Sequence, residues 1–264
     1  MKAGFRGNLV GTWLAALVAL LQSWPAAPYA AEVPVVAAAS DLQYVLVEVS
    51  ETFTRDTGRA VKLSMGSSGN FTRQIMQGAP FELFFSADEG YVTELAGRGL
   101  TQDAGALYAV GRLALFVPRG SAVKADAQLH DLAASLADGR LRKLAIANPE
   151  HAPYGRAARQ TLEKAGIWEK LQGRLVMGEN VSQAAQFAAT GSVEAALIAY
   201  SLAISGPMAG RGAYVLVPEE WHRPLRQRMV LLKGAGATAR AFYAFVQLRS
   251  ARAVFERYGF SLPQ

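Results

Sequence analysis

Short apolar runs alternate along the chain with segments whose apolar residues recur at helical spacing. The first run, VPVVAAA at residues 33–39, precedes a segment in which residues 42, 45, 46, 49 and 53 are apolar and which Gly58 ends. Continuous apolar runs of this length are typical of buried strands, and the spacing that follows is typical of a helix. The order recurs, with strands predicted at 60–64 and 81–85 and helices at 71–77 and 86–95. It indicates a parallel sheet covered by helices.

A second unit of this kind follows a long extended segment, LYAVGRLALFVP at residues 107–118. We expect a strand of that length to cross between two lobes. The elements predicted beyond it are helices at 129–136, 156–165 and 183–189, strands at 143–147, 175–177, 193–200, 213–217 and 228–232, and a helical region at 237–258. Because parallel strands of one sheet share their carboxyl-terminal edge, the strand-to-helix turns of each lobe should face a common cleft.

The first 31 residues have the layout of a cleaved secretory signal. Lys2 and Arg6 precede an apolar run at 9–21, and small residues end the segment at Ala30 and Ala31. The run is shorter than the roughly 20 apolar residues of a membrane-spanning helix. We therefore expect an exported protein and leave residues 1–31 out of the fold.

The composition of the chain excludes several kinds of site and partner. The chain has no cysteine, which excludes disulfides, thiolate metal sites and lipid attachment through an N-terminal cysteine. Without Lys2 and Arg6, 25 of the 27 basic residues remain against 21 acidic ones, and they are scattered rather than gathered in a stripe. We therefore expect no nucleic-acid partner.

The turn MGSSGNFTRQI, at residues 65–75, is the strongest candidate for chemistry. It leads from a predicted strand into a predicted helix, where the first backbone N–H groups have no partner within the helix. Glycines let a ligand approach the main chain, and Ser67 and Ser68 add hydroxyl donors, so the turn suits an oxyanion. An ordinary turn with a serine as helix N-cap is the alternative. Ser40 follows another strand in the same way.

Several motifs occur together over nearly the whole chain after residue 31. They are AAASDL (37–42), the SS turn followed by RQI (67–75), GAPFELFFSAD (78–88), PEHAPYGRAA (149–158), ENVSQA (179–184), a strand ending at Tyr200, and FERYGF (255–260). In this order they resemble the periplasmic molybdate-binding proteins of ABC-type molybdate importers, which are type II periplasmic binding proteins.

The resemblance implies an α/β fold of two lobes, each a mixed, mostly parallel sheet covered by helices, with the ligand cleft between the lobes. The first lobe would comprise residues 32–110 and 228–264, with the C-terminal helices returning to it, and the second lobe residues 111–227. Two segments, near 110–113 and 226–230, would cross between the lobes and allow hinge closure around the ligand.

The resemblance also implies the ligand-binding residues, which are Ser40, Ser68, Tyr154, Val181 and Tyr200, with Ser67 as an additional donor. The serines would offer hydroxyls and backbone N–H groups, Tyr154 and Val181 backbone N–H groups, and Tyr200 its phenol. Molybdate or tungstate would be bound as an oxyanion, with no ligands for a metal cation and no Lys or Arg at the site. The protein would act in the periplasm as a monomer without a cofactor and pass its ligand to the membrane permease.

Three other functions compete with this one. Among binding proteins, the alternative is a protein for another tetrahedral oxyanion, such as sulfate or phosphate. A serine hydrolase would need Ser40 or Ser68 beside His130, His151 or His222, which we expect to be ordinary surface histidines. The ligand-sensing domain of a transcription regulator would lack a secretory signal.

Charged residues near the expected site are predicted to point away from it. Asp41 and Glu179 should face outward as cap or surface residues, and Arg73 should point away from the serine turn.

Overall fold

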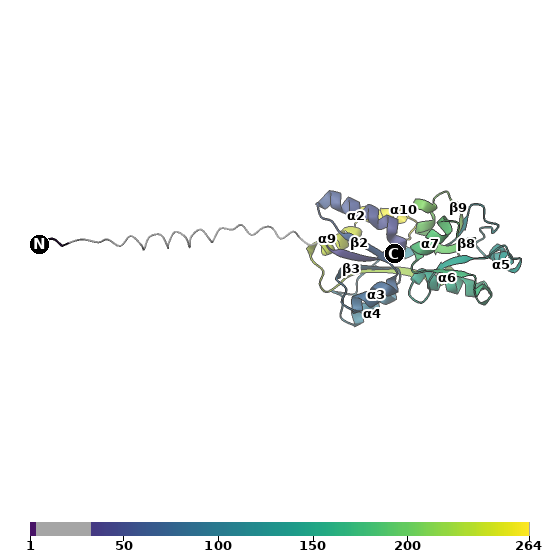
Figure 1. The fold of residues 1–264 in the computed structure, drawn as a ribbon, viewed down its shortest axis with the longest axis horizontal. Coiled ribbons are helices and arrows are strands. Elements are labelled where there is room, and N and C mark those ends of the chain that lie inside the picture. Colours follow the sequence, from purple (N-terminus) through teal and green to yellow (C-terminus); the bar gives the residue numbers. More distant parts are fainter. Residues whose placement is uncertain (4–32, 264) are drawn as a thin grey trace. The chain divides into compact units, whose positions relative to one another are not determined.

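Two five-stranded sheets organise the fold (Figure 1). The computed structural model describes residues 1–3 and 33–263, so the predicted signal segment lies almost wholly outside the described residues. The described part of the chain contains no helix that is both long enough and apolar enough to cross a membrane.

The first sheet is mixed. Its strands, in sheet order, are β2 (Lys62–Gly66), β1 (Val35–Ala39), β3 (Phe81–Ser86), β10 (Leu225–Leu231) and β4 (Ala106–Gly111). β1 pairs in parallel with β2 and β3, while β10 runs antiparallel to β3 and β4. The first three strands therefore end at one edge, as their strand-helix order predicted.

The second sheet repeats this arrangement. Its strands, in sheet order, are β7 (Leu175–Gly178), β6 (Leu144–Ala147), β8 (Ala195–Ala199), β5 (Leu113–Pro118) and β9 (Gly212–Leu216). β6 is parallel to β7 and β8, and β5 is antiparallel to β8 and β9. Both lobes thus have the predicted mixed sheet.

Helices cover both faces of the first sheet because its strand residues are apolar on both sides. Val36 and Ala38 belong to the core formed with α2 (Gln43–Thr57), α9 (Ala237–Val246) and α10 (Arg249–Arg257). Ala37, between them, packs on the other face with residues of α3 (Ser68–Met76) and α4 (Glu89–Gly97). Figure 1 shows these two layers above and below the strands, with the C-terminal helices on the first lobe.

The second lobe is built around one large core. Its α-helices are α5 (His130–Ala137), α6 (Pro153–Lys164), α7 (Val181–Ala189) and the short α8 (Tyr200–Ala203). The short 3₁₀ turns of the chain are η1 (Ser40–Leu42), η2 (Glu169–Leu171), η3 (Gly206–Met208) and η4 (Glu219–Trp221). Both α6 and α7 contact strands β6 and β8, so their N-termini lie at the carboxyl end of this sheet.

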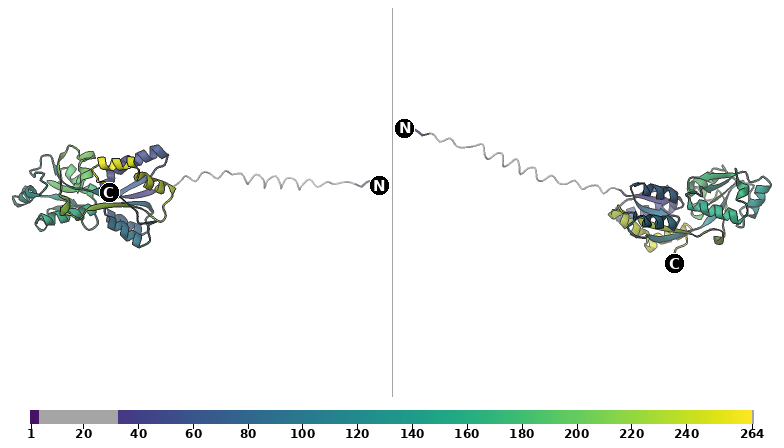
Figure 2. Two further views of the ribbon diagram at one scale, coloured as in Figure 1. Left: turned by 180° about the vertical axis from the view of Figure 1, so that it is seen from behind. Right: turned by 90° about the horizontal axis from the view of Figure 1, so that it is seen from below.

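The expected extended segment at 107–118 is two strands rather than one. β4 ends at Gly111 in the first sheet and β5 begins at Leu113 in the second, with Arg112 between them. The return crossing precedes Leu225, where β10 begins. Figure 2 shows the two lobes next to each other with these strands passing between them. The residue limits predicted for the lobes stay a prediction.

Candidate oxyanion-binding site

A small cavity lies where the two lobes meet, with about 180 Å³ of space between the protein atoms, part of it open to solvent. A cavity of this size suits a small ion rather than a larger organic ligand. The lining residues are Ala39, Ser40, Asp41, Gly66, Ser67, Ser68 and Ala87 from the first lobe and Ala152, Pro153, Tyr154 and Val181 from the second. Five of the six predicted positions are therefore brought together.

Four helical segments begin at the cavity. Ser40 opens η1, Ser68 opens α3, Val181 opens α7, and Tyr154 is the second residue of α6, after Pro153. The first N–H groups of a helix have no intrahelical acceptor and carry partial positive charge. Three of these helices are at least nine residues long, so each directs an appreciable dipole toward the cavity.

The hydroxyls of Ser40 and Ser68 are both held as acceptors. Ser40 Oγ accepts from the backbone N–H of Ser182 at 3.2 Å, and Ser68 Oγ accepts from the backbone N–H of Ala87 at 3.0 Å. A hydroxyl has one proton and can accept and donate at once. Each of these two serines therefore keeps its proton free for an anion in the cavity. The contact between Ser40 and Ser182 also joins the two lobes.

The start of α7 shows how a helix cap leaves one donor free. The side chain of Asn180 accepts from the N–H groups of Ser182 and Gln183, the second and third residues of the helix. The N–H of Val181 is left without a partner among the residues described here. Val181 lines the cavity, and the role of its N–H as a donor to a ligand stays a prediction.

Tyr200 does not line this cavity. It is the first residue of α8, where the sequence predicted a strand end, and its ring lies against Tyr214 with 5.6 Å between the ring centroids. The predicted contact of its phenol with a ligand stays a prediction.

Ser67 differs from the other two serines. It is the N-cap residue of α3, but its side chain makes no capping hydrogen bond. Instead Ser67 Oγ lies 2.9 Å from Nδ1 of His151, whose Nε2 lies 3.6 Å from an oxygen of Glu179. His151 is 7% exposed and His222 is 9% exposed, so the expectation of ordinary surface histidines was wrong at both positions. The place of His151 in PEHAPYG, directly before the start of α6, was the available sequence signal.

Asp41 does not point outward as expected, and only 1% of it is exposed. Its Oδ2 accepts from the side-chain amide of Gln227 at 2.6 Å, and the Gln227 carbonyl accepts from the Tyr108 phenol at 2.7 Å. Burial raises the pKa of the Asp41 carboxyl from its ordinary 3.8 to about 6, although Gln227 and the nearby Tyr154 phenol offset part of that effect. The carboxylate therefore belongs to a buried network beside the crossing strands.

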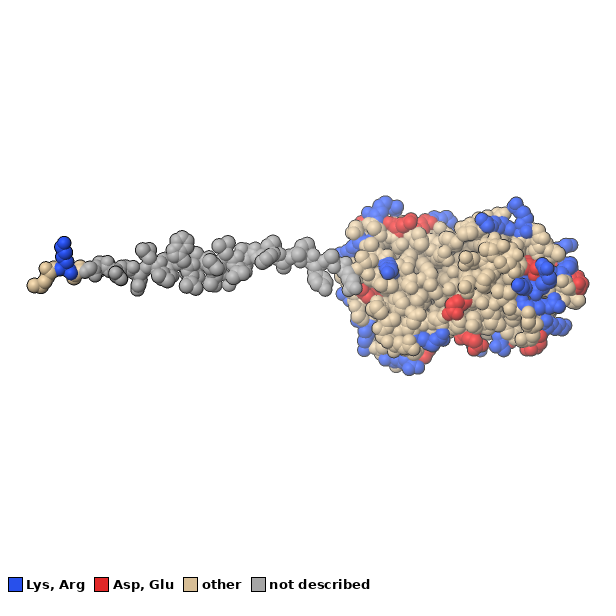
Figure 3. Space-filling model, in the orientation of Figure 1, with Lys and Arg blue, Asp and Glu red and all other residues tan. Residues whose placement is uncertain are grey.

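No Lys or Arg is among the lining residues of the described cavity. Arg73 donates to Asn70 on its own helix, and Arg156 pairs with Asp88 at 2.5 Å, so both guanidinium groups are engaged elsewhere. On the face shown in Figure 3, basic and acidic side chains are spread mainly around the periphery of the described residues. The potential that would hold an anion here comes from backbone dipoles and hydroxyls.

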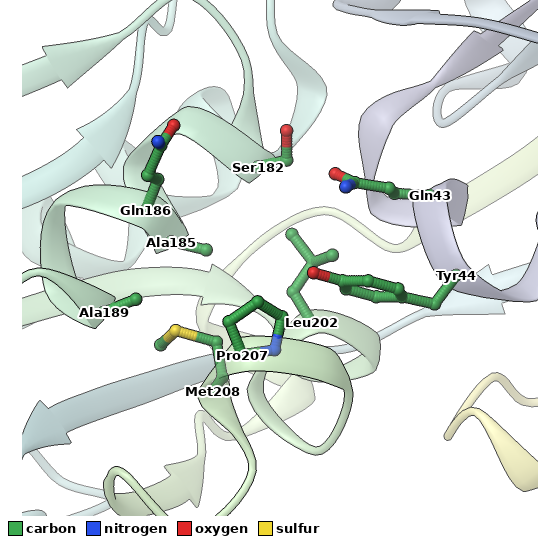
Figure 4. A pocket seen from close by; sticks show the side chains of 9 residues that line it. All are labelled: Gln43, Tyr44, Ser182, Ala185, Gln186, Ala189, Leu202, Pro207 and Met208. Carbon is green, nitrogen blue, oxygen red and sulfur yellow. The ribbon is translucent and has the colours of Figure 1, made fainter.

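A larger cavity lies beside the first one. Its lining includes Gln43 and Tyr44 at the start of α2, Ser182 and Gln186 on α7, and an apolar floor with Met208. Figure 4 shows the side chains that line this space. Neither cavity has a cationic residue in its lining among the described residues, and the smaller cavity is the better candidate for an anion because five of the six predicted positions line it.

Two lobes joined by crossing strands, with a donor-lined cavity between them, define a solute-binding protein. The chain belongs to the family of bacterial extracellular solute-binding proteins, which it matches over residues 34–261. It is therefore a binding protein and not an enzyme, and the hydrolase alternative is wrong.

Named relatives agree with this assignment. The chain is 35% identical over 238 residues to the molybdate-binding protein ModA of Rhodobacter capsulatus, covering 89% of this chain and 90% of the relative. It is 36% identical over 239 residues to ModA of Azotobacter vinelandii, with 89% and 92% covered. The solved structure of the A. vinelandii periplasmic molybdate-binding protein matches with a TM-score of 0.80 at 32% identity, covering 88% of this chain and 100% of that one. The predicted family resemblance and fold class are confirmed.

Proposed function

We propose that the protein captures molybdate or tungstate in the cavity between its lobes and delivers it to the membrane permease of an ABC importer. Export by the predicted signal would place it in the periplasm, where it would act as a monomer without a cofactor. The relatives named as molybdate-binding proteins support the ligand class, since each matches about nine-tenths of the chain.

The convergence of helix starts on one small cavity is the observation that carries the proposal. The proposed donors are the hydroxyls and N–H groups of Ser40 and Ser68 and the N–H groups of Tyr154 and Val181, with Tyr200 kept from the family resemblance. Because these groups come from both lobes, a dianion between them would favour the closed arrangement.

The assigned role of each donor follows from its other hydrogen bonds. Ser40 and Ser68 accept from backbone N–H groups, so their hydroxyl protons are available. A dianion can accept from all of them at once, and hydrogen bonds to a charged acceptor are stronger than those between neutral groups. Charge compensation by neutral donors then needs no cationic side chain in the cavity.

Calorimetric titration of the purified protein, dialysed free of anions, tests the proposal. We expect saturable binding of one molybdate per chain, with tungstate competing for the same site. A protein that bound no molybdate would contradict the proposal. Sulfate or phosphate binding as tight as molybdate binding would instead favour a protein for another tetrahedral oxyanion.

A further inference from the structure

His151 makes two hydrogen bonds to the serine turn, and ligand capture by neutral donors does not explain them. His151 precedes α6 in the second lobe, yet its ring and its backbone carbonyl both meet residues of the first lobe. Its carbonyl accepts from the N–H of Gly69 at 2.9 Å, and its Nδ1 lies 2.9 Å from Ser67 Oγ. Ser67 lines the proposed oxyanion cavity and is 3% exposed.

We propose that His151 is a positioning residue whose protonation state decides whether the Ser67 hydroxyl can donate to the bound oxyanion. The proposal rests on the proposed function, because it concerns a further donor at the same site. It assigns His151 no contact with the ligand.

The proton positions on the ring give the reason. In neutral His151 the proton lies best on Nε2, because Glu179 Oε2 is 3.6 Å from that atom and would repel a lone pair there. Nδ1 is then an acceptor and takes the Ser67 hydroxyl proton. Ser67 consequently turns an oxygen lone pair toward the cavity, which is unfavourable for an anion.

Protonation of His151 reverses the hydrogen bond. Both ring nitrogens then carry protons, so Nδ1–H donates to Ser67 Oγ and Nε2–H faces the Glu179 carboxylate. The Ser67 hydroxyl proton is released and can donate to an oxyanion. Binding of a dianion should therefore favour the protonated ring and take up a proton at pH values where the free protein has lost it.

The charged groups around His151 are mostly paired with one another. Arg156 pairs with Asp88 and donates to the Tyr91 phenol, which in turn approaches the His151 carbonyl at 3.4 Å. On α3, Arg73 donates to the side-chain oxygen of Asn70.

Glu179 accepts from the Asn70 amide while facing the His151 ring. Glu150, directly before His151 in sequence, is exposed. Glu179 is therefore the charged group placed to stabilise a protonated ring.

Titration of wild type and Ser67→Ala with molybdate at pH 6 and pH 8 tests the proposal. We expect the loss of affinity caused by Ser67→Ala to be larger at pH 6 than at pH 8, because the lower pH favours the protonated ring and with it the donating hydroxyl. Between pH 6 and pH 8 the affinity of wild type for molybdate should fall by at most about tenfold per pH unit. Titrations in buffers of different ionisation enthalpy measure the proton taken up on binding. An equal loss at both pH values would overturn the proposal.

His151→Gln should remove this pH dependence, because an amide does not titrate, while His130→Gln is the matched control and should keep the wild-type slope. A slope that survived His151→Gln and vanished in Asp41→Asn would overturn the proposal and assign the proton to Asp41.

As a test that needs no variant, the NMR titration midpoint of His151 should rise when molybdate is bound, and an unchanged midpoint would contradict the proposal. Molybdate binding without pH dependence would overturn this inference alone, whereas no binding at any pH would overturn the proposed function as well.

Discussion

At the scale of single residues, the three serines of the site have the same side chain but different hydrogen-bonding states. Ser40 and Ser68 accept from backbone N–H groups, which fixes their oxygens and leaves their protons free. Ser67 Oγ is instead hydrogen-bonded to a histidine ring. A donor at an anion site is therefore defined by what else the hydroxyl contacts, and this is a property of the folded chain.

We expect Ser40→Ala and Ser68→Ala each to weaken molybdate binding about tenfold to a hundredfold, because a hydrogen bond to a charged ligand contributes roughly 1.5–3 kcal/mol. Calorimetric titration of the two variants measures the effect. Arg73→Gln is the control, since Arg73 is bonded to Asn70 and should leave the affinity unchanged. Wild-type affinity in both alanine variants would show that these hydroxyls do not bind the ligand, and lost binding in Arg73→Gln would contradict neutral charge compensation.

Asp41 gives the molecule a pH dependence of stability that is opposite to that of most carboxylates. Its folded pKa of about 6 lies above the ordinary 3.8, so between these values the folded state holds more protons than the unfolded state. Stability is therefore lost as the pH rises through this window, and the loss remains at higher pH. A pKa raised by this amount corresponds to about 3 kcal/mol.

Asp41→Asn should remove this loss, because an amide keeps the oxygen that accepts from Gln227 and carries no charge. We expect the free energy of unfolding of wild type to fall by up to about 3 kcal/mol more than that of the variant between pH 4 and pH 7. Denaturant titrations at several pH values measure the difference. Asp56→Asn, at an exposed position, is the control and should follow the wild-type profile. If the free energy of unfolding changed with pH in the same way for wild type and Asp41→Asn, the raised pKa assigned to Asp41 would be contradicted.

At the scale of elements, the site is formed by turns that lead from strands into helices, and the sequence predicts such turns. Strands β1, β2, β6 and β7 are each followed by a helical segment, and parallel neighbours share their carboxyl ends. The positions of Ser40 and Ser68 at helix starts were therefore predictable from short apolar runs and the turn residues after them. Family resemblance added Tyr154 and Val181, whose N–H groups lie at the starts of α6 and α7.

The rest of the site depends on pairs of residues far apart in sequence. His151 meets Ser67 across 84 positions, and Asp41 meets Gln227 across 186. No local pattern relates such residues, because their approach is set by how the two lobes close. Asp41 was expected to face outward as a helix cap, but the chain begins this helical segment with the 3₁₀ turn η1, and all three residues of that turn are buried.

The crossing strands show a similar dependence on distant contacts. Gly111 ends β4 beside Arg112, and a side chain at Gly111 would collide with the Tyr154 phenol and the Gln227 amide. That amide donates to the phenol at 3.3 Å, so α6 of the second lobe is tied to β10 of the first. The hydrophobic pattern predicted a crossing here, while the absence of a side chain at Gly111 is what allows the tyrosine to approach it.

At the scale of the whole molecule, selectivity depends on which hydrogen-bonding groups the closed lobes present. Asp41 is the one carboxylate among the lining residues, and its Oδ2 is bonded to Gln227, which lies outside the cavity lining. The groups proposed to bind the ligand are all donors. A phosphate ion that keeps a proton near neutral pH brings a donor that needs an acceptor. Leaving that proton unpaired costs about 1–3 kcal/mol.

Sulfate is fully deprotonated, as are molybdate and tungstate, but it is smaller. Donors on two lobes that close around a larger tetrahedron cannot all reach a smaller one, and lengthened hydrogen bonds weaken steeply. We therefore expect molybdate and tungstate to bind alike, sulfate far more weakly and phosphate most weakly of the four. Competition titrations at pH 7.5 measure the order. Molybdate and tungstate have the same charge and shape and nearly the same size. Ser68→Ala should therefore weaken the binding of both equally. If Ser68→Ala weakened the binding of one of these two ions much more than the other, the expectation that both are bound with the same geometry would be contradicted.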